Sequence, residues 1–383
     1  MRYSLIQGLG LAALCSTALG AQTRVVFPPQ FEKMEGNSSS SSYSYGNPFY
    51  STSSASYRSY RYMQVMDLDP KVKGKITGLA WRRDGMRNAG KIISGVQVEM
   101  ELSLSTTRMT SSTMSKTFAS NVGTDATQVV ARKKINFATV PYLGTMPEPF
   151  FVRVPFDSGK QFAYDASKGG LLMDMRVHDN NLYDANTGTY TYLDLDLASI
   201  TTGGSTVTWG DGCSYDFYAY PMSYSGSATV DSTSNNLRLY GNASNGLPGQ
   251  PLIWISAVDG MSKTGVKLPT GCNLYLDLTR MLAMNVAIAD SQGSARWPAT
   301  GYIEFPYSKD YAGTKIDSQA LSLDAASGRL YSSNFHRAIV PLWESGVTLP
   351  TARVYKAGST AHTDVDGYGP YTGYSLVTSL TVQ

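Results

Sequence analysis

The feature that most constrains this fold is a pair of cysteines, Cys213 and Cys272, at the two ends of a segment rich in strand-forming residues. Each cysteine follows a glycine, and the only other cysteine of the chain is Cys15, near its start. A bridge between the pair would close a loop of about 60 residues and stabilise the fold by about 4 kcal/mol, because it restricts the unfolded chain. The alternative is two free buried thiols, and the choice depends on whether the chain is exported.

The N-terminal residues have the pattern of a secretory signal. Arg2 precedes an uncharged apolar run over residues 5–19, which ends in the small-residue stretch Ala18-Leu19-Gly20-Ala21. This run is too short for a membrane anchor and predicts a signal peptide over residues 1–20, cleaved before Ala21. Lipidation at Cys15 is disfavoured by the bulky Leu14 before it. No later stretch has the roughly 18 apolar residues of a transmembrane helix. We therefore expect a secreted or cell-surface protein without a membrane span, in which Cys213 and Cys272 are paired.

Composition supports an extracellular β protein, because charged residues make up only 16% of the chain while Gly and Tyr are abundant. The 32 Lys and Arg residues nearly balance the 29 Asp and Glu residues. Nucleic-acid binding needs a strong basic excess, so the sequence predicts no nucleic-acid partner. The short basic runs Arg82-Arg83 and Arg132-Lys133-Lys134 are interpreted as solvated strand ends.

Apolar and polar residues alternate in several segments, which predicts strands with one face on a core and the other in water. The clearest such segment is residues 95–105, and residues 171–177 and 192–197 repeat the pattern. Turn-forming runs lie between them, at 157–160 and 186–188. Further strands are expected at 237–239, 252–255, 274–276, 303–305 and 319–321. The sequence therefore predicts an all-β fold with two antiparallel β-sandwich domains, jelly-roll or Ig-like, in tandem.

The expected domain limits follow from composition. Residues 21–61 form a Ser/Tyr-rich N-terminal arm. Tyrosines recur in it and just after it, at 43, 45, 50, 57, 60 and 62, and are candidates for stacking against sugar rings. The first sandwich is predicted over residues 62–203. A small, polar linker at 201–205 leads to the second sandwich, 206–383, with the disulfide. Residues 347–383 are expected to add extra C-terminal strands, with pairing to the first domain as the alternative.

A family resemblance is carried by turn and packing motifs in both halves. In the second half these are Gly210-Asp211-Gly212-Cys213, Leu268-Pro269-x-Gly271-Cys272 and Ser333-Asn334, and in the first half Ile76-Thr77-Gly78-Leu79-Ala80-Trp81-Arg82-Arg83-Asp84 and Ser120-Asn121-Val122-Gly123-Thr124-Asp125. With these motifs the chain resembles secreted proteins of unknown function from planctomycete-type bacteria, with a two-cysteine β-sandwich module in the C-terminal half. The resemblance implies a fold and a compartment, and it implies no activity or site residues.

Catalytic patterns are weak throughout the chain. The three histidines, His178, His336 and His362, lack metal-ligand spacing and are treated as unclustered, and no G-x-S-x-G nucleophile elbow occurs. Glu99 and Glu101 point to the same face of one predicted strand, as the two carboxylates of a glycosidase would, but surface strands commonly carry such pairs. Asp194 and Asp196 are likewise expected on a water-facing strand, with ordinary pKa values. We therefore predict no catalytic residue, no metal and no cofactor.

Two acidic loops, at 179–188 and 364–367, carry closely spaced Asp and Asn residues of the kind that Ca²⁺ takes as ligands. Neither fits a full twelve-residue calcium loop, and turn formation is the preferred interpretation.

Together these patterns predict a non-catalytic structural or binding protein of the cell envelope or extracellular matrix. Candidate partners are a surface polysaccharide or another envelope protein. The alternative is an extracellular carbohydrate-active enzyme, with a carboxylate-based site on one sandwich.

Overall fold

The computed structural model describes residues 22–36, 48–49, 58–85, 96–138, 146–180, 183–184, 189–190, 193, 195–215, 220–298 and 302–383. The predicted signal peptide, most of the Ser/Tyr-rich arm and the turn expected at 186–188 lie outside these residues. Within them, nearly all regular structure is β-strand, and every strand pair is antiparallel. Helical elements are single turns: η1 (Pro29–Phe31), α1 (Phe118–Asn121), η3 (Ala166–Lys168), η4 (Leu278–Arg280) and η5 (Lys309–Tyr311). The predicted all-β, sandwich-like fold is confirmed.

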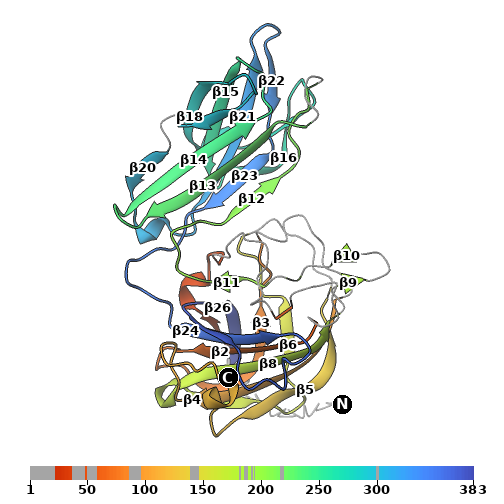
Figure 1. Cartoon of the computed structure of the whole chain (residues 1–383), viewed down its shortest axis with the longest axis vertical. Helices are drawn as coiled ribbons and strands as arrows, with labels where there is room; N and C mark the ends of the chain where they lie inside the picture. The colour runs from red at the N-terminus through yellow and green to blue at the C-terminus, as the bar shows by residue number, and fades with distance from the viewer. Residues whose placement is uncertain are drawn as a thin grey trace, which may run out of the picture.

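One group of strands, the lower sandwich in Figure 1, packs two sheets face to face. The larger sheet has the order β25 (Tyr368–Thr372), β24 (Thr351–Ala357), β2 (Tyr60–Met66), β8 (Gly170–Asn180), β4 (Gln97–Thr107) and β5 (Thr127–Asn136). The facing sheet has the order β1 (Thr23–Phe27), β27 (Thr378–Val382), β3 (Lys73–Trp81) and β6 (Val152–Pro155), and β7 (Phe162–Asp165) also pairs with β3. The core between them includes Tyr62, Trp81, Met100, Met175 and Leu380, all fully buried.

Two short ladders accompany these sheets. One joins β9 (Tyr183–Asp184) to β10 (Thr189–Tyr190), and the other joins β11 (Leu197–Ala198) to β26 (Ser375–Leu376).

A second group, the upper sandwich, is built from residues 206–339 (Figure 1). Its larger sheet has the order β12 (Thr206–Trp209), β23 (Phe335–Ile339), β21 (Lys315–Asp324), β15 (Pro251–Val258) and β18 (Met281–Ile288), and β22 (Arg329–Ser332) also pairs with β21. Opposite lie β13 (Ser223–Asp231), β14 (Asn236–Ser244), β19 (Ala295–Trp297) and β20 (Ile303–Pro306). Trp254 and Trp297 meet in the core between these sheets.

The hairpin of β16 (Met261–Lys267) and β17 (Asn273–Leu276) covers the outer face of the larger upper sheet. Leu274 and Leu276 of the hairpin pack on Ile255, Leu321 and Phe335 of the sheet. The fully buried Gln319 holds the two layers together, because its amide accepts a hydrogen bond from Tyr275 N at 2.8 Å and donates one to Asn273 O at 2.9 Å.

The C-terminal strands pair with the N-terminal half of the chain. β24 lies between β2 and β25, and β27 lies between β1 and β3. Residues 347–383 were expected to add strands to the second sandwich, with pairing to the first domain as the alternative. The strand register gives the alternative, because the tail extends the sheets of the first half. The residues of the upper sandwich are thus nested in sequence between strands of the lower one. The division into two independent domains stays a prediction.

Alternating sequence patterns located most strands. In β4 the even-numbered residues from Val98 to Leu104 are buried and their odd neighbours to Ser103 are partly exposed, as period two predicts. In β8 the prediction of a water-facing side is wrong, since residues 171–175 are all buried. The reason is a second apolar layer over this central strand, where Phe118 and Met114 pack on Leu172. Of the segment 192–197 the structure describes residues 193 and 195–197, and within these the assigned strand is β11, which begins at Leu197.

The stretch at 201–205, predicted to be a linker, runs beside β13 and is bonded to it. Val230 N donates to Thr202 O at 2.7 Å, and Gly204 N donates to Ala228 O at 2.9 Å. Ser205 is buried. The segment between the sandwiches is therefore held in place by backbone hydrogen bonds.

Candidate functional site

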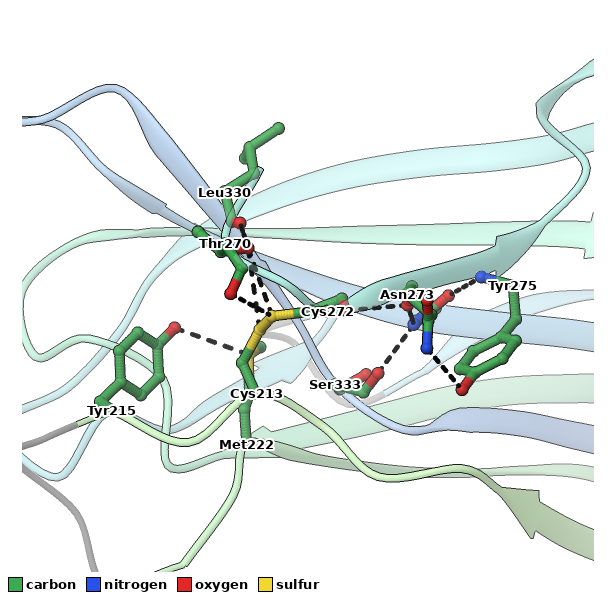
Figure 2. Close-up of a disulfide and its surroundings, with 11 residues drawn as sticks. Cys213, Tyr215, Met222, Thr270, Cys272, Asn273, Tyr275, Leu330 and Ser333 are labelled. Carbon is green, nitrogen blue, oxygen red and sulfur yellow. Dashed lines mark hydrogen bonds between the residues drawn. A yellow bond between two sulfur atoms is a disulfide. The ribbon is translucent and has the colours of Figure 1, made fainter. Parts of the chain in front are cut away.

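The predicted bridge between Cys213 and Cys272 is present (Figure 2). The two Cα atoms lie 5.5 Å apart, which is within the usual range for a disulfide. Cys213 N donates a hydrogen bond to Ser332 O at 2.8 Å, and the Thr270 hydroxyl, two residues before Cys272, donates to Leu330 O at 2.6 Å. The bridge and these hydrogen bonds therefore fasten the segment after β12 and the β16–β17 hairpin to β22.

A cluster of exposed tyrosines forms at the edge of the larger lower sheet, where β24 and β25 pair. Arg353 lies directly opposite Tyr371, and Tyr355 lies opposite Tyr368. Directly opposed residues of antiparallel strands point to the same face of the sheet, so all four side chains share one side. We call Arg353, Tyr355, Tyr368, Tyr371 and the nearby Tyr374 the tyrosine surface. The outer three tyrosines are 50%, 40% and 46% exposed, which leaves their rings accessible.

The rings of the tyrosine surface are held by stacking from the core outward. Tyr60 stacks on Tyr355 with centroids 6.1 Å apart, and Tyr355 stacks on Tyr371 at 5.7 Å, each pair at an interplanar angle of 20°. Tyr368 lies 5.6 Å from Tyr355 in a tilted arrangement. Aromatic pairs at such distances contribute about 0.5–1.5 kcal/mol each beyond their buried area. The exposed rings are thus anchored to a buried one.

A cation lies among these rings. The Arg353 guanidinium carbon is 5.8 Å from the ring centroids of Tyr355 and Tyr371 and 6.0 Å from that of Tyr374. Arg353 also hydrogen-bonds Tyr62, whose pKa burial raises. Burial, with Tyr371 next in effect, raises the pKa of Tyr355 to about 12. Its hydroxyl therefore stays protonated and neutral near pH 7. The tyrosine surface offers flat rings, hydroxyl groups and the positive charge of Arg353, which suits binding of a polar partner.

The sequence placed candidate sugar-stacking tyrosines in and just after the N-terminal arm. Tyr60 and Tyr62 are fully buried, and the tyrosines at 43, 45, 50 and 57 lie outside the described residues. The exposed rings come from the tail, where tyrosines recur every third residue at 368, 371 and 374 among glycines and a proline. That spacing is a signal available in the sequence, but it does not reveal that Arg353 lies opposite.

Two of the three histidines lie together, so treating all three as unclustered is wrong. The rings of His178 and His362 are 4.3 Å apart, and His178 Nε2 is 3.2 Å from Glu101 Oε1. Burial, and then the nearby His178, lower the pKa of His362. The pair forms because β8 ends beside the turn that follows β24, where His362 Nε2 is 3.0 Å from Val177 O. The third histidine, His336, is buried in the upper sandwich, and burial lowers its pKa to about 4.

On the outer face of β4 and β5, the carboxylates of Glu99 and Glu101 are bonded to cationic and amide side chains. Glu99 accepts a hydrogen bond from Arg132 Nε at 2.6 Å, and this bond lowers the pKa of Glu99. Glu101 accepts from Gln128 at 2.8 Å and lies 3.6 Å from Arg176. A glycosidase needs one carboxyl with a raised pKa as its acid, and Glu99 is shifted the other way.

Arg82, Arg83 and Asp196 are buried, which corrects two expectations. Arg82 and Arg83 are not solvated strand ends, and Asp196 is not on a water-facing strand. Arg82 Nε donates to Asp196 Oδ2 at 2.6 Å, and Arg83 donates twice to Glu148, at 2.6 and 3.0 Å. Asp194 lies outside the described residues.

Desolvation dominates the electrostatics of this buried network. Burial raises the pKa of Asp196, against the opposing effect of Arg82, and it also raises the pKa of Glu148. Glu35 is fully enclosed beside them, and its pKa is raised well above the usual range by burial and then by the charge of Asp196. One oxygen of Glu35 accepts a hydrogen bond from Gly85 N at 2.7 Å. These groups fix loops at the inner end of the lower sandwich.

The acidic loops give no metal centre in the part of the chain that the structure describes. Asp364 pairs with Lys356 at 2.9 Å and Thr360, whereas Asp366 pairs with Lys116 at 3.1 Å and Thr117, so the two carboxylates have separate partners. The loop at 179–188 lies largely outside the described residues. Across the described ranges, no three His, Cys, Asp or Glu side chains gather as metal ligands would, and no helix is long and apolar enough to cross a bilayer.

Comparisons with known proteins give little guidance. No protein-family model matches the chain, and no curated protein matches it. One similar solved structure is Bifidobacterium dentium β-glucuronidase complexed with coumarin-3-O-glucuronide, with 9% sequence identity and a TM-score of 0.16 over 73% of this chain and 40% of that one. Another is Bacteroides uniformis β-glucuronidase, with 11% identity and a TM-score of 0.16 over 77% of this chain and 27% of that one. The chain thus spans less than half the length of either enzyme, and similarity this low supports no conclusion about function.

Proposed function

We propose that this protein is a secreted, non-catalytic binding component of the cell envelope or extracellular matrix, and that the tyrosine surface is where it contacts a surface polysaccharide. The observation that carries the proposal is the group of three half-exposed tyrosine rings at 368, 371 and 374, two of which, Tyr371 and Tyr374, lie beside the Arg353 guanidinium. Flat rings pack against the apolar faces of sugars, while tyrosine hydroxyls and a guanidinium bond to their hydroxyl and acidic groups. A polysaccharide with acidic groups fits this chemistry best.

A non-catalytic role is favoured by the distribution of tuned carboxyls among the described residues. The carboxyls with a raised pKa, Glu35, Glu148 and Asp196, are all enclosed, which keeps a substrate from them. The more accessible Glu99 and Asp364 have lowered pKa values because Arg132 and Lys356 bond to them. General acid catalysis on a polymer needs a carboxyl that has a raised pKa and is also accessible to the polymer. Among these carboxyls, those with a raised pKa are enclosed and the accessible ones have a lowered pKa.

The test is binding of the purified protein to arrays of neutral and acidic polysaccharides. Tyr371→Ala combined with Tyr374→Ala should weaken binding by about 10-fold or more, since one buried ring contact is commonly worth at least 1–2 kcal/mol. Tyr240→Ala is the matched control, because Tyr240 is 46% exposed on β14 of the upper sandwich. Arg353→Gln should weaken binding to acidic polymers and reduce its dependence on salt.

Equal binding by the double variant and the Tyr240→Ala control would contradict the proposed site. Reproducible hydrolysis of a bound polymer, abolished by one carboxylate substitution in a folded protein, would instead support the enzyme alternative.

A further inference from the structure

The upper sandwich has one long edge strand, β18, that carries apolar side chains in solvent. β18 pairs on one side with β15, in a register that sets Ile253 opposite Val286. In the described part of the chain no strand pairs with its other side. An edge of this kind presents a row of backbone donors and acceptors that a further strand can join.

The backbone orientation of β18 shows which groups face that free edge. Just beyond the strand, Ala289 N donates to Gln250 O at 3.0 Å, so odd-numbered positions face β15. Val286 N donates instead to the side chain of its own neighbour, Asn285, at 2.7 Å. Because backbone groups alternate along a strand, the N–H and C=O groups of residues 284, 286 and 288 point to the free edge.

The same even-numbered residues carry the exposed apolar side chains. Met284 is 60% exposed, Val286 53% and Ile288 64%, and Met281 and Leu282 are about half exposed at the start of the strand. No residue from 281 to 288 is charged. Sheet edges are usually protected by lysine, proline or a bulge, and β18 has only one register shift, near its start. An uncharged apolar edge is suited to a partner strand of the same kind.

We propose that β18 pairs antiparallel with β18 of a second copy of this chain, which joins the two upper sandwiches in one continuous sheet. Pairing centred on Asn285 sets Met284 opposite Val286 of the second copy and Leu282 opposite Ile288. In this register even-numbered residues of one copy pair with even-numbered residues of the other. Their apolar side chains therefore meet on one face of the sheet, and their free N–H groups lie opposite free C=O groups. The strand is thus complementary to itself, and a two-fold arrangement closes at the dimer.

The surface available is sufficient for a weak but specific dimer. A strand of eight residues is about 27 Å long. Five side chains that are each about half exposed leave on the order of 500 Å² of apolar surface per copy, so two copies would cover about 1,000 Å², where specific interfaces begin. An unrelated extended peptide would also find free backbone groups here. Such a peptide would also make the apolar side-chain contacts only if its sequence resembled that of β18. A second copy of this chain meets this condition.

The test is the mass of the full mature chain by sedimentation equilibrium from about 1 to 100 µM, the range over which weak dimers form. We expect the wild type to dimerise in this range and Val286→Lys to stay monomeric, because the substitution places two charges near each other at the paired edge. Val266→Lys is the matched control: Val266 is 61% exposed on the β16–β17 hairpin, and its variant should dimerise as the wild type does. Circular dichroism of each variant checks that it is folded.

A second variant reports the register directly. In pairing centred on residue 285, the two copies of Asn285 form a non-hydrogen-bonded pair with Cα atoms about 4.5 Å apart, which a disulfide spans. Mild oxidation of Asn285→Cys should therefore yield a covalent dimer. A wild type that is monomeric throughout, a Val286→Lys variant that dimerises equally well, growth in mass beyond a dimer, or a dimer without the cross-link would each overturn the proposal.

Discussion

Removal of the disulfide offers the most quantitative test of how the upper sandwich is stabilised. The perturbation is the double substitution Cys213→Ser and Cys272→Ser, which deletes the bridge without leaving a lone thiol. The bridged residues are 59 positions apart in sequence, and the loop between them contains β13 to β16. For a loop of about 60 residues, the entropy restored to the unfolded chain corresponds to about 4 kcal/mol at 25 °C.

The native geometry suggests that most of this free energy is realised. The Cα separation of 5.5 Å is near the most common value for a disulfide, and Cys213 is buried. For a unit of about 150 residues, each kcal/mol lowers the melting temperature by about 2–4 °C, so the double variant should melt about 8–16 °C lower.

The assay is calorimetry of the oxidised wild type and the double variant, with Ser291→Ala as a control at an exposed turn of the same sandwich. A fall in melting temperature no larger than that of the control would refute the reasoning. Free-thiol titration of the denatured, unreduced mature protein is an independent check. It should detect no thiol, and two titratable thiols would show that the bridge does not form.

Three further predictions concern buried ionisable groups. Arg82→Met leaves the Asp196 carboxyl buried without its cation, so it should lower the free energy of unfolding, measured in urea, by about 3–5 kcal/mol. Combining Arg82→Met with Asp196→Leu should recover most of this loss, and an equally unstable double variant would contradict the prediction. Burial lowers the pKa of His336 to about 4, so between about pH 6.5 and 4 the unfolded chain binds a proton that the folded one does not. Stability should fall by up to about 3 kcal/mol as the pH falls through this window, and His336→Gln should remove that slope; an unchanged slope counts against it. The raised pKa of Glu35 acts in the opposite direction, because only the unfolded chain loses this proton just above pH 4.5. Stability from this group should fall as the pH rises, and Glu35→Gln should flatten that part of the profile; identical pH profiles would disprove it.

Local patterns in the sequence were sufficient to predict the fold class. Strict alternation from Val98 to Leu104 predicted the burial of β4 residue by residue, and turn residues at 157–160 predicted a turn in which Lys160 N donates to Asp157 O at 2.8 Å. The cysteine pair was also predictable, because an isolated pair in a chain that is expected to be exported has few other roles.

Long-range pairing was not predictable from the same patterns. Alternation specifies which residues share a face, and it does not specify which strand lies alongside or what covers the second face. Leu172 is buried because the segment carrying Phe118 crosses over it, and His178 meets His362 across a separation of 184 residues. Arg82 and Arg83 resembled surface charges because their partners, Asp196 and Glu148, are 114 and 65 residues away.

The candidate site depends on both kinds of information. The three tyrosines of the tail are visible in the sequence as a repeat with a spacing of three residues. Their meeting with Arg353 depends on the register of β25 against β24, and the ring that anchors them, Tyr60, belongs to a strand more than 300 residues earlier. Such a surface becomes visible only once the ends of the chain are placed together.

The position of β27 between β1 and β3 affects the order in which the chain can fold as it is made. Strands β12 to β23 find all their partners within residues 206–339, so this part can close while the C-terminal residues are still being synthesised. Among the described residues β1 pairs in its sheet with β27 alone, so it must wait for some of the last residues to emerge. During that delay the apolar faces of β2 and β3 are incompletely covered, which is the stage at which chains aggregate or need a chaperone. Shortening the chain by a few C-terminal residues would therefore impair the earliest strands most.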